Sequence, residues 1–134
     1  MASRKRRVGI IGAGGIGSVV AGFLDRAGYD VTLIDAWHEH IDACATRGLT
    51  VRTAQGEEFV SHPAAVHLQD LQALNETFDI GMVAVNAYDT TWATACLDRF
   101  VARDGVMCCF QNGVNDEDVA AVAGRERTVG VQSA

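Results

Sequence analysis

Apolar residues along the chain follow two spacings, one typical of buried strands and the other of amphipathic helices. Short, nearly continuous apolar runs indicate strands covered on both faces, and apolar residues three or four positions apart indicate helices packed on a sheet. Strands are predicted at 8–11, 30–34, 65–68, 79–85, 105–110 and 128–131, and helices at 18–27, 38–47, 90–100 and 116–123. This alternation predicts an α/β fold with a doubly wound, mainly parallel sheet and helices on both faces.

One segment interrupts the alternation. Residues 49–53 and 57–60 flank Ala54-Gln55-Gly56, which predicts a β-hairpin with glycine in its turn, inserted into the parallel plan. After it, the spacing of Leu68, Leu71 and Leu74 indicates a turn or brief helix.

The helical spacing also predicts which side chains face the sheet. The first helix is expected to end at Gly28, with glycine in the left-handed conformation that closes many helices. Trp92 is interpreted as a core residue rather than a cofactor contact. The expected inward faces are Ile16, Val19, Val20, Phe23 and Leu24 in the first helix, Ile41, Cys44 and Ala45 in the second, and Trp92, Ala95, Cys96 and Phe100 in the third.

The turn after the first strand carries a glycine pattern that suits phosphate binding. Its residues are Gly12, Ala13, Gly14, Gly15, Ile16 and Gly17. In a strand, turn and helix unit, the first glycine permits the tight turn, the second lets the backbone approach a pyrophosphate, and the last lets the helix pack closely. The pyrophosphate then lies on amides at the start of the helix.

Three further polar residues follow predicted strands. Asp35 comes where such units carry the carboxylate that binds the adenosine ribose, and Asn86 and Asn112 come after later strands. Because parallel strands end at one edge of the sheet, we expect these residues and the glycine turn to lie together there.

Composition and charge restrict the classes of partner. A chain of 134 residues, 49% hydrophobic, suits one domain covering 1–134, and a net charge of −6 argues against nucleic acid and anionic membranes as partners. No apolar run approaches the ~20 residues of a membrane span, so a cytoplasmic location is expected. The basic run 4–7 is interpreted as a solvated lead-in to the first strand.

The cysteines and histidines suggest no metal site. Cys44, Cys96, Cys108 and Cys109 lack a C-x-x-C spacing and are expected to be free, buried thiols, the adjacent pair pointing to opposite faces of the sheet. His38 and His40 point in different directions on a helix and are expected to be exposed near the nucleotide.

Three motifs together resemble the amino-terminal domain of the ketopantoate reductases (2-dehydropantoate 2-reductases). They are G-A-G-G-I-G at 12–17, V-N-A-Y-D at 85–89 and F-Q-N-G-V-N at 110–115. The resemblance implies reduction of a 2-keto acid to a 2-hydroxy acid by hydride transfer from NADPH, in pantothenate biosynthesis. It also implies that the glycine turn holds the pyrophosphate and that Asn112 contacts the nicotinamide ribose and the substrate.

Two positions depart from the NADPH pattern of that family. Asn86 stands where the family usually has lysine, and Asp35 stands near the place where members that use NADPH carry arginine. A 2′-phosphate about 4 Å from a carboxylate is repelled by about 4 kcal/mol per charge at an effective dielectric constant of 20. We therefore expect NAD(H) to be preferred over the family's usual NADP(H), unless Arg47 or another base compensates.

The catalytic group of the family is also missing. Ketopantoate reductases have a helical carboxyl-terminal domain with a catalytic lysine, whereas the only lysine here is Lys5. We therefore expect the chain to be part of a longer reductase, inactive by itself and prone to self-association as a homodimer. Two alternatives are a stand-alone regulatory NAD(H)-sensing domain of the potassium-transport type and another two-domain dehydrogenase of the 3-hydroxyacid or 6-phosphogluconate type.

Overall fold

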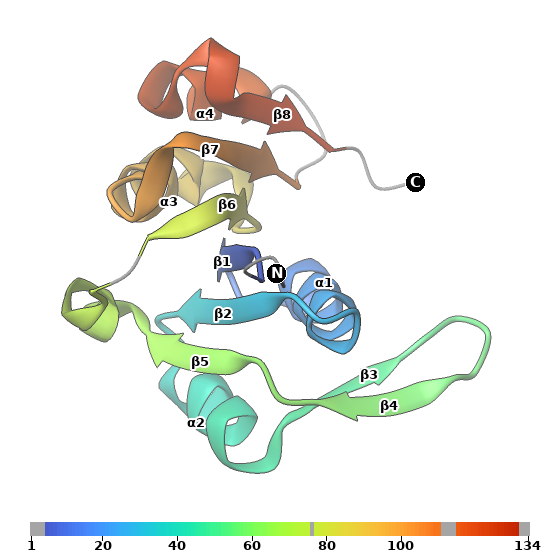
Figure 1. Cartoon of the computed structure of the whole chain (residues 1–134). Coiled ribbons are helices and arrows are strands. Elements are labelled where there is room, and N and C mark those ends of the chain that lie inside the picture. The colour runs from blue at the N-terminus through green and yellow to red at the C-terminus, as the bar shows by residue number, and fades with distance from the viewer. Residues whose placement is uncertain (1–4, 76, 111–114, 132–134) are drawn as a thin grey trace, which may run out of the picture.

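A computed structural model of the chain describes residues 5–75, 77–110 and 115–131. Six parallel strands form one sheet in the order β5-β2-β1-β6-β7-β8, which Figure 1 shows from bottom to top. Their bounds are Arg7–Ile11 for β1, Asp30–Asp35 for β2, Ala64–His67 for β5, Phe78–Val83 for β6, Val101–Cys109 for β7 and Thr128–Gly130 for β8. The predicted doubly wound, mainly parallel sheet is confirmed.

Helices pack on both faces of this sheet. The side chains of α1 (Gly15–Arg26) and α2 (His38–Arg47) join the apolar layer on one face, and those of α3 (Thr90–Asp98) and α4 (Asn115–Ala123) join the layer on the other. Short 3₁₀ helices follow β5, β6 and α4: η1 (Leu68–Ala73), η2 (Ala87–Asp89) and η3 (Arg125–Arg127). The chain therefore builds β1, β2 and β5 outward to one edge, and then β6, β7 and β8 outward to the other.

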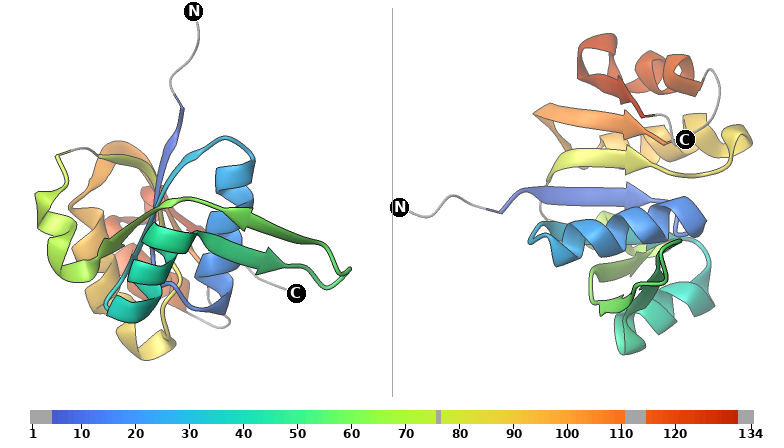
Figure 2. Two further views of the ribbon diagram at one scale, coloured as in Figure 1. Left: turned by 90° about the horizontal axis from the view of Figure 1, so that it is seen from below. Right: turned by 90° about the vertical axis from the view of Figure 1, so that its right-hand side faces the viewer.

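The hairpin is a separate two-stranded antiparallel sheet of β3 (Leu49–Arg52) and β4 (Glu58–Ser61), as predicted. Figure 1 and the left view of Figure 2 show it projecting from the body of the domain. It is attached to α1: the Arg26 guanidinium lies 4.0 Å from the centre of the Phe59 ring, and the Ser61 hydroxyl donates to the Asp25 carboxylate. The insertion thus packs against α1.

The predicted inward face of α1 is wrong in part, although Val20 and Leu24 are half-buried against the apolar layer as predicted. Ile16, Val19 and Phe23 are 43%, 41% and 36% exposed, whereas Gly17 and Ala21 are buried. Small residues let α1 approach the strands closely, and the larger side chains then extend outward. The helix does end as predicted, since Gly28 has φ +100° and donates its N–H to the Asp25 carbonyl.

The predicted faces of α2 and α3 are wrong in part. In α2, Ile41 and Cys44 are buried, but Ala45 is exposed. In α3, Trp92 and Ala95 are exposed and Cys96 is only half-buried. The residues of α3 that pack inward form a second set with helical spacing: Thr90, Ala93, Thr94 and Leu97.

Two further predictions concerned the cysteine thiols and the basic run at residues 4–7. Cys108 and Cys109 contribute to opposite apolar layers, as expected, and burial raises the pKa of the Cys44 and Cys108 thiols, which keeps them protonated at neutral pH. Arg7 is not solvated as predicted, because its side chain is 15% exposed and donates to the Thr77 carbonyl.

Two kinds of feature are absent from the described residues. Within them, no helix is long and apolar enough to cross a membrane. The same part of the chain contains no cluster of three or more acidic, histidine or cysteine residues suited to a metal ion.

Candidate dinucleotide-binding site

The turn between β1 and α1 is held tightly against the end of β6. Gly12 has φ +112°, and a Cβ atom at this position would lie 2.4 Å from the Ala84 carbonyl oxygen. A Cβ atom at Gly17 would lie 1.8 Å from the carbonyl oxygen of Gly12. Both glycines are therefore required by the backbone, which agrees with the roles expected for the first and last glycines of the pattern.

The middle of the turn faces open space. Added Cβ atoms at Gly14 and Gly15 would have no neighbour within 4 Å, and both residues are exposed. The helix begins at Gly15, three residues earlier than the predicted start at Ser18, so its first turn contains the glycine segment. The amides of a first helical turn have no partner within the helix and favour negative charge.

Ala13 and Ile16, the non-glycine members of the pattern, lie differently. Ala13 is 1% exposed, its N–H donates to Oδ2 of Asp35 at 2.6 Å, and its carbonyl accepts from the Ser18 hydroxyl at 2.9 Å. Ile16 points outward. The backbone of Ala13 is therefore fixed on both sides, which orients the turn that follows it.

Asp35 lies at the end of β2 and faces the cavity rather than the interior. It is half-buried, and its Oδ1 atom accepts the N–H of Trp37 at 2.9 Å. A carboxylate offers about four acceptor positions, so further positions remain for hydroxyl groups of a ligand. The two backbone donors hold the side chain at the rim of the glycine turn.

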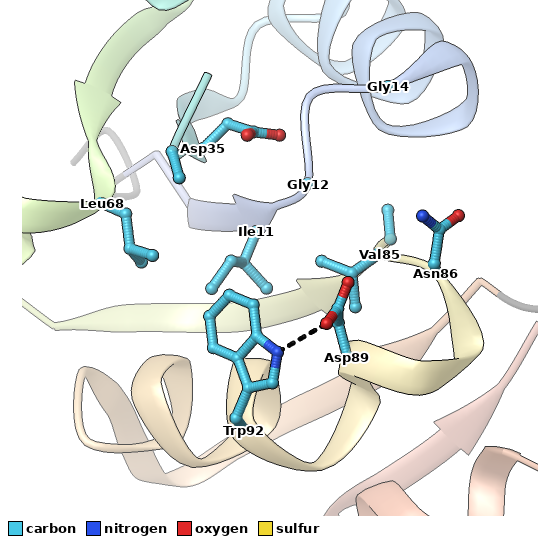
Figure 3. A pocket seen from close by; sticks show the side chains of 11 residues that line it. Ile11, Gly12, Gly14, Asp35, Leu68, Val85, Asn86, Asp89 and Trp92 are labelled. Carbon is cyan, nitrogen blue, oxygen red and sulfur yellow. Dashed lines mark hydrogen bonds between the residues drawn. The ribbon is translucent and has the colours of Figure 1, made fainter. Parts of the chain in front are cut away.

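A cavity of about 310 Å³ lies where the first turn meets the ends of β2 and β6 (Figure 3). It contains two carboxylates, Asp35 and Asp89, and no arginine, lysine or histidine is among the described residues that line it. The lining residues are Ile11, Gly12, Gly14, Asp35, Ala36, Leu68, Ala84, Val85, Asn86, Asp89 and Trp92.

The structure brings together most of the residues predicted for the site. Asn86 is exposed and lines the cavity with Gly12, Gly14 and Asp35. Asn112 lies outside the described residues, so its predicted contact with nicotinamide and substrate stays a prediction.

Sequence reasoning missed Trp92 as a residue of the cavity. Its indole is 43% exposed rather than in the core, and its Nε1–H donates to Oδ1 of Asp89 at 2.9 Å (Figure 3). The sequence did contain a signal for this position. Ala93 and Leu97 form an apolar stripe that faces inward, and this places Trp92 on the flank of α3.

The histidines near the cavity differ from each other. His38 is exposed, as expected, and its ring lies against that of His67, with ring centres 4.4 Å apart and the planes tilted by 30°. His40 is half-buried, which corrects the expectation: it lies 3.3 Å from the Ser18 hydroxyl and stacks on Trp37. The start of α2 is thereby linked to the start of α1.

The strand order, the glycine turn at a helix start and the carboxylate after β2 define the Rossmann class of dinucleotide-binding domains. In sheets of this class, ligands bind beyond the carboxyl ends of the strands where the order reverses, here between β1 and β6. The cavity lies at that point.

Sequence comparison assigns the family. The profile of the family described as ketopantoate reductase PanE/ApbA matches residues 8–132, and the chain belongs to this family. It is 35% identical over 118 residues to the 2-dehydropantoate 2-reductase of Archaeoglobus fulgidus, covering 88% of this chain and 36% of that protein. It is 31% identical over 112 residues to the 2-dehydropantoate 2-reductase of Lactococcus lactis, and the match covers 84% of this chain and 35% of that protein.

Solved structures agree on the fold. The putative 2-dehydropantoate 2-reductase of Enterococcus faecalis aligns with a TM-score of 0.78 at 26% identity, over 92% of this chain and 40% of that one. D-mandelate dehydrogenase in a ternary structure with NADH and anilino(oxo)acetate aligns with a TM-score of 0.80, over 94% of this chain and 40% of that one. Its sequence identity is 21%, so this likeness shows the fold alone. The chain thus spans little more than a third of its relatives' length, and the matches favour the reductase over the regulatory alternative.

Proposed function

We propose that this chain is the nicotinamide-dinucleotide-binding part of an oxidoreductase that reduces a 2-keto acid, 2-dehydropantoate or a related compound, to a 2-hydroxy acid. The observation that carries the proposal is the convergence of the open glycine turn, Asp35 and Asn86 on one cavity, in a chain of the ketopantoate reductase family. The bound dinucleotide would supply the hydride.

Each group of residues has a chemical task in this proposal. Backbone amides from Gly14 onward hold the pyrophosphate, and the Asp35 carboxylate accepts hydrogen bonds from the ribose hydroxyls. Asn86 offers an amide that both donates and accepts near the middle of the dinucleotide. Asn112 is proposed to contact the nicotinamide ribose and the keto acid.

The charges of the cavity support a preference for NAD(H) over NADP(H). A 2′-phosphate beside Asp35 would meet a carboxylate that two backbone amides fix in place, and Asp89 adds a second negative charge. Arg47 does not compensate, because α2 starts near Asp35 and carries Arg47 at its other end, about 14 Å along the axis at 1.5 Å per residue.

Turnover needs a group that the described cavity does not supply. Hydride transfer to a ketone leaves an alkoxide, which requires a proton donor or a positive charge within hydrogen-bond reach. The described residues that line the cavity offer carboxylates and an amide instead. We therefore propose that this chain binds the dinucleotide and reduces little or no substrate by itself.

Calorimetric titration of the protein with NADH, NADPH and ADP-ribose tests the proposal. We expect NADH to bind at least tenfold more tightly than NADPH, and Asp35→Asn to reduce this ratio because it removes the repelling charge. Glu39→Gln is the matched control: it removes one nearby exposed charge that does not line the cavity, and the ratio should stay unchanged. Tighter binding of NADPH would contradict the cofactor preference, and no binding of any of the three would contradict the proposed function.

A further inference from the structure

The turn between β1 and α1 and the turn between β2 and α2 are joined by a closed cycle of contacts. Resting on the proposed function, we infer that this contact cycle fixes the two turns relative to each other, and that His40 is a positioning residue for the dinucleotide. The members of the contact cycle are Asp35, Ala13, Ser18, His40 and Trp37.

Asp35 makes the first connection between the two turns. Its Oδ2 atom accepts the N–H of Ala13 in the first turn, and its Oδ1 atom accepts the N–H of Trp37 in the second. An aspartate that binds the amide two residues further on is a common way to fix a turn. Figure 3 shows the Asp35 carboxylate directed toward the turn of Gly12 and Gly14. One side chain therefore orients the backbone of both turns.

His40 makes the second connection. The Ser18 hydroxyl donates to the Ala13 carbonyl at 2.9 Å, and its oxygen lies 3.3 Å from Nε2 of His40. Because a hydroxyl has a single proton, Nε2 of His40 carries the proton of the second contact and is its donor. The imidazole also stacks on the indole of Trp37, with ring centres 4.8 Å apart and the planes 25° apart, which closes the contact cycle.

The contact cycle is attached to the buried part of the fold at two points. Ala13 is 1% exposed, and Cys44, one helical turn after His40, is 3% exposed with its sulfur 3.8 Å from Nε2 of His40. Ser18 and His40 are half-buried, so water competes only partly for their contact. Neither of them lines the cavity, so they act on a ligand through the backbone that they hold.

A dinucleotide bound as proposed spans both turns, with its phosphates at Gly14 and its adenosine ribose at Asp35. Groups that are held at the required spacing before binding lose less freedom when the ligand binds, so the affinity is higher. Breaking the contact cycle should therefore weaken all ligands that span the two turns by a similar factor. The ratio of NADH to NADPH affinity depends on the charge of Asp35 and should stay unchanged.

Substitution of His40 tests this role by calorimetry with ADP-ribose and NADH. His40→Phe keeps a flat ring against Trp37 but removes the N–H donor, and both ligands should bind about fivefold more weakly, the factor that corresponds to one neutral hydrogen bond. His40→Gln places an amide N–H close to the position of Nε2 and should restore the affinity to within about twofold. His38→Phe is the matched control, because it makes the same change two residues earlier on α2, at an exposed side chain outside the contact cycle, and should leave the affinity unchanged.

Substitution of Ser18 shows whether the two side chains act through one contact. Ser18→Ala should weaken ADP-ribose at least as much as His40→Phe does, and adding His40→Phe to Ser18→Ala should cause no further loss. Alanine has the highest helix propensity, so weaker binding by Ser18→Ala would not reflect a loss of helix. Thermal melting shows that each variant compared is folded.

The outcomes separate this inference from the function on which it rests. Suppose that the unchanged protein binds NADH and ADP-ribose. If His40→Phe then binds them equally well, if His40→Gln is as weak as His40→Phe, or if His38→Phe is equally weak, the positioning role of His40 is wrong and the proposed function stands. Additive losses in the double variant would also contradict the contact cycle. If the unchanged protein binds neither ligand, the proposed function fails.

Discussion

The turn after β1 and the turn after β6 occupy equivalent places in the two halves of the domain, yet they line the cavity in different ways. The first turn presents backbone, since Gly14 and Gly15 have open space where a side chain would be. The second turn and the start of α3 present side chains, with Asn86, Asp89 and Trp92 lining the cavity. One half is thus suited to phosphate and the other to the remaining parts of a nucleotide.

Local geometry explains the difference. The helix after β1 begins at Gly15, directly after Gly14, which lines the cavity. After β6 the chain makes the 3₁₀ turn η2 before α3 begins at Thr90, which moves the start of α3 away from the strand end. The two turns touch at the Gly12 Cα and the Ala84 carbonyl. A side chain at Gly12 would therefore displace the second turn.

The largest effect is expected where the first turn is most crowded. Gly17→Ala would place a methyl group 1.8 Å from the Gly12 carbonyl oxygen, so the backbone must shift. We expect a loss of about 3 kcal/mol in the free energy of unfolding, the upper part of the range for overpacked sites. This exceeds the gain of about 1 kcal/mol from alanine's helix propensity. Urea denaturation measures the change in the free energy of unfolding.

The control for this variant is Gly14→Ala, whose methyl group would enter open space. Its φ of −77° is accessible to alanine, so its stability should stay within about 0.5 kcal/mol of the unchanged protein. Equal stabilities for the two variants would contradict the division of roles among the glycines.

The second effect is on binding rather than stability. In Gly14→Ala, the added methyl group would occupy the space through which the pyrophosphate approaches the amides. We expect the affinity for NADH and for ADP-ribose to fall at least tenfold, because hydrogen bonds to a charged group contribute about 1.5–3 kcal/mol. Calorimetry measures the loss, and unchanged affinity would show that the phosphates lie elsewhere.

The same contrast explains how much the sequence could predict. A turn that binds through its backbone needs glycine at fixed positions, so the role of Gly12, Gly14 and Gly17 was visible in the sequence and agrees with the crowding and open space around them. Asp35 was found by its distance along the chain from that pattern. The apolar spacing likewise predicted the sheet, α2 and the hairpin.

Side chains that bind from a helix flank have no such signature. Trp92 is large and apolar, and spacing alone assigned it to the core, because the smaller Ala93 and Leu97 form a competing stripe. The face of α1 was predicted only in part for a related reason: close packing selects Gly17 and Ala21, which carry little hydrophobic signal. The start of β7 at Val101 was also missed, because it depends on an irregular register opposite Phe78 and Ile80.

The smallest effect tests the second turn directly. Asn86 and Tyr88 are two residues apart in the same turn, but Asn86 lines the cavity whereas Tyr88 is 99% exposed and does not. Asn86→Ala should weaken NADH binding about threefold to fivefold, because one neutral hydrogen bond contributes roughly 1 kcal/mol.

Tyr88→Ala is the matched control, and it should leave the affinity unchanged although it removes a far larger side chain. ADP-ribose sharpens the comparison, since it lacks the nicotinamide. If Asn86 acts on the nicotinamide half, its loss should weaken NADH more than ADP-ribose. Equal weakening of both ligands would place Asn86 at the pyrophosphate, and the second turn would then share the task of the first.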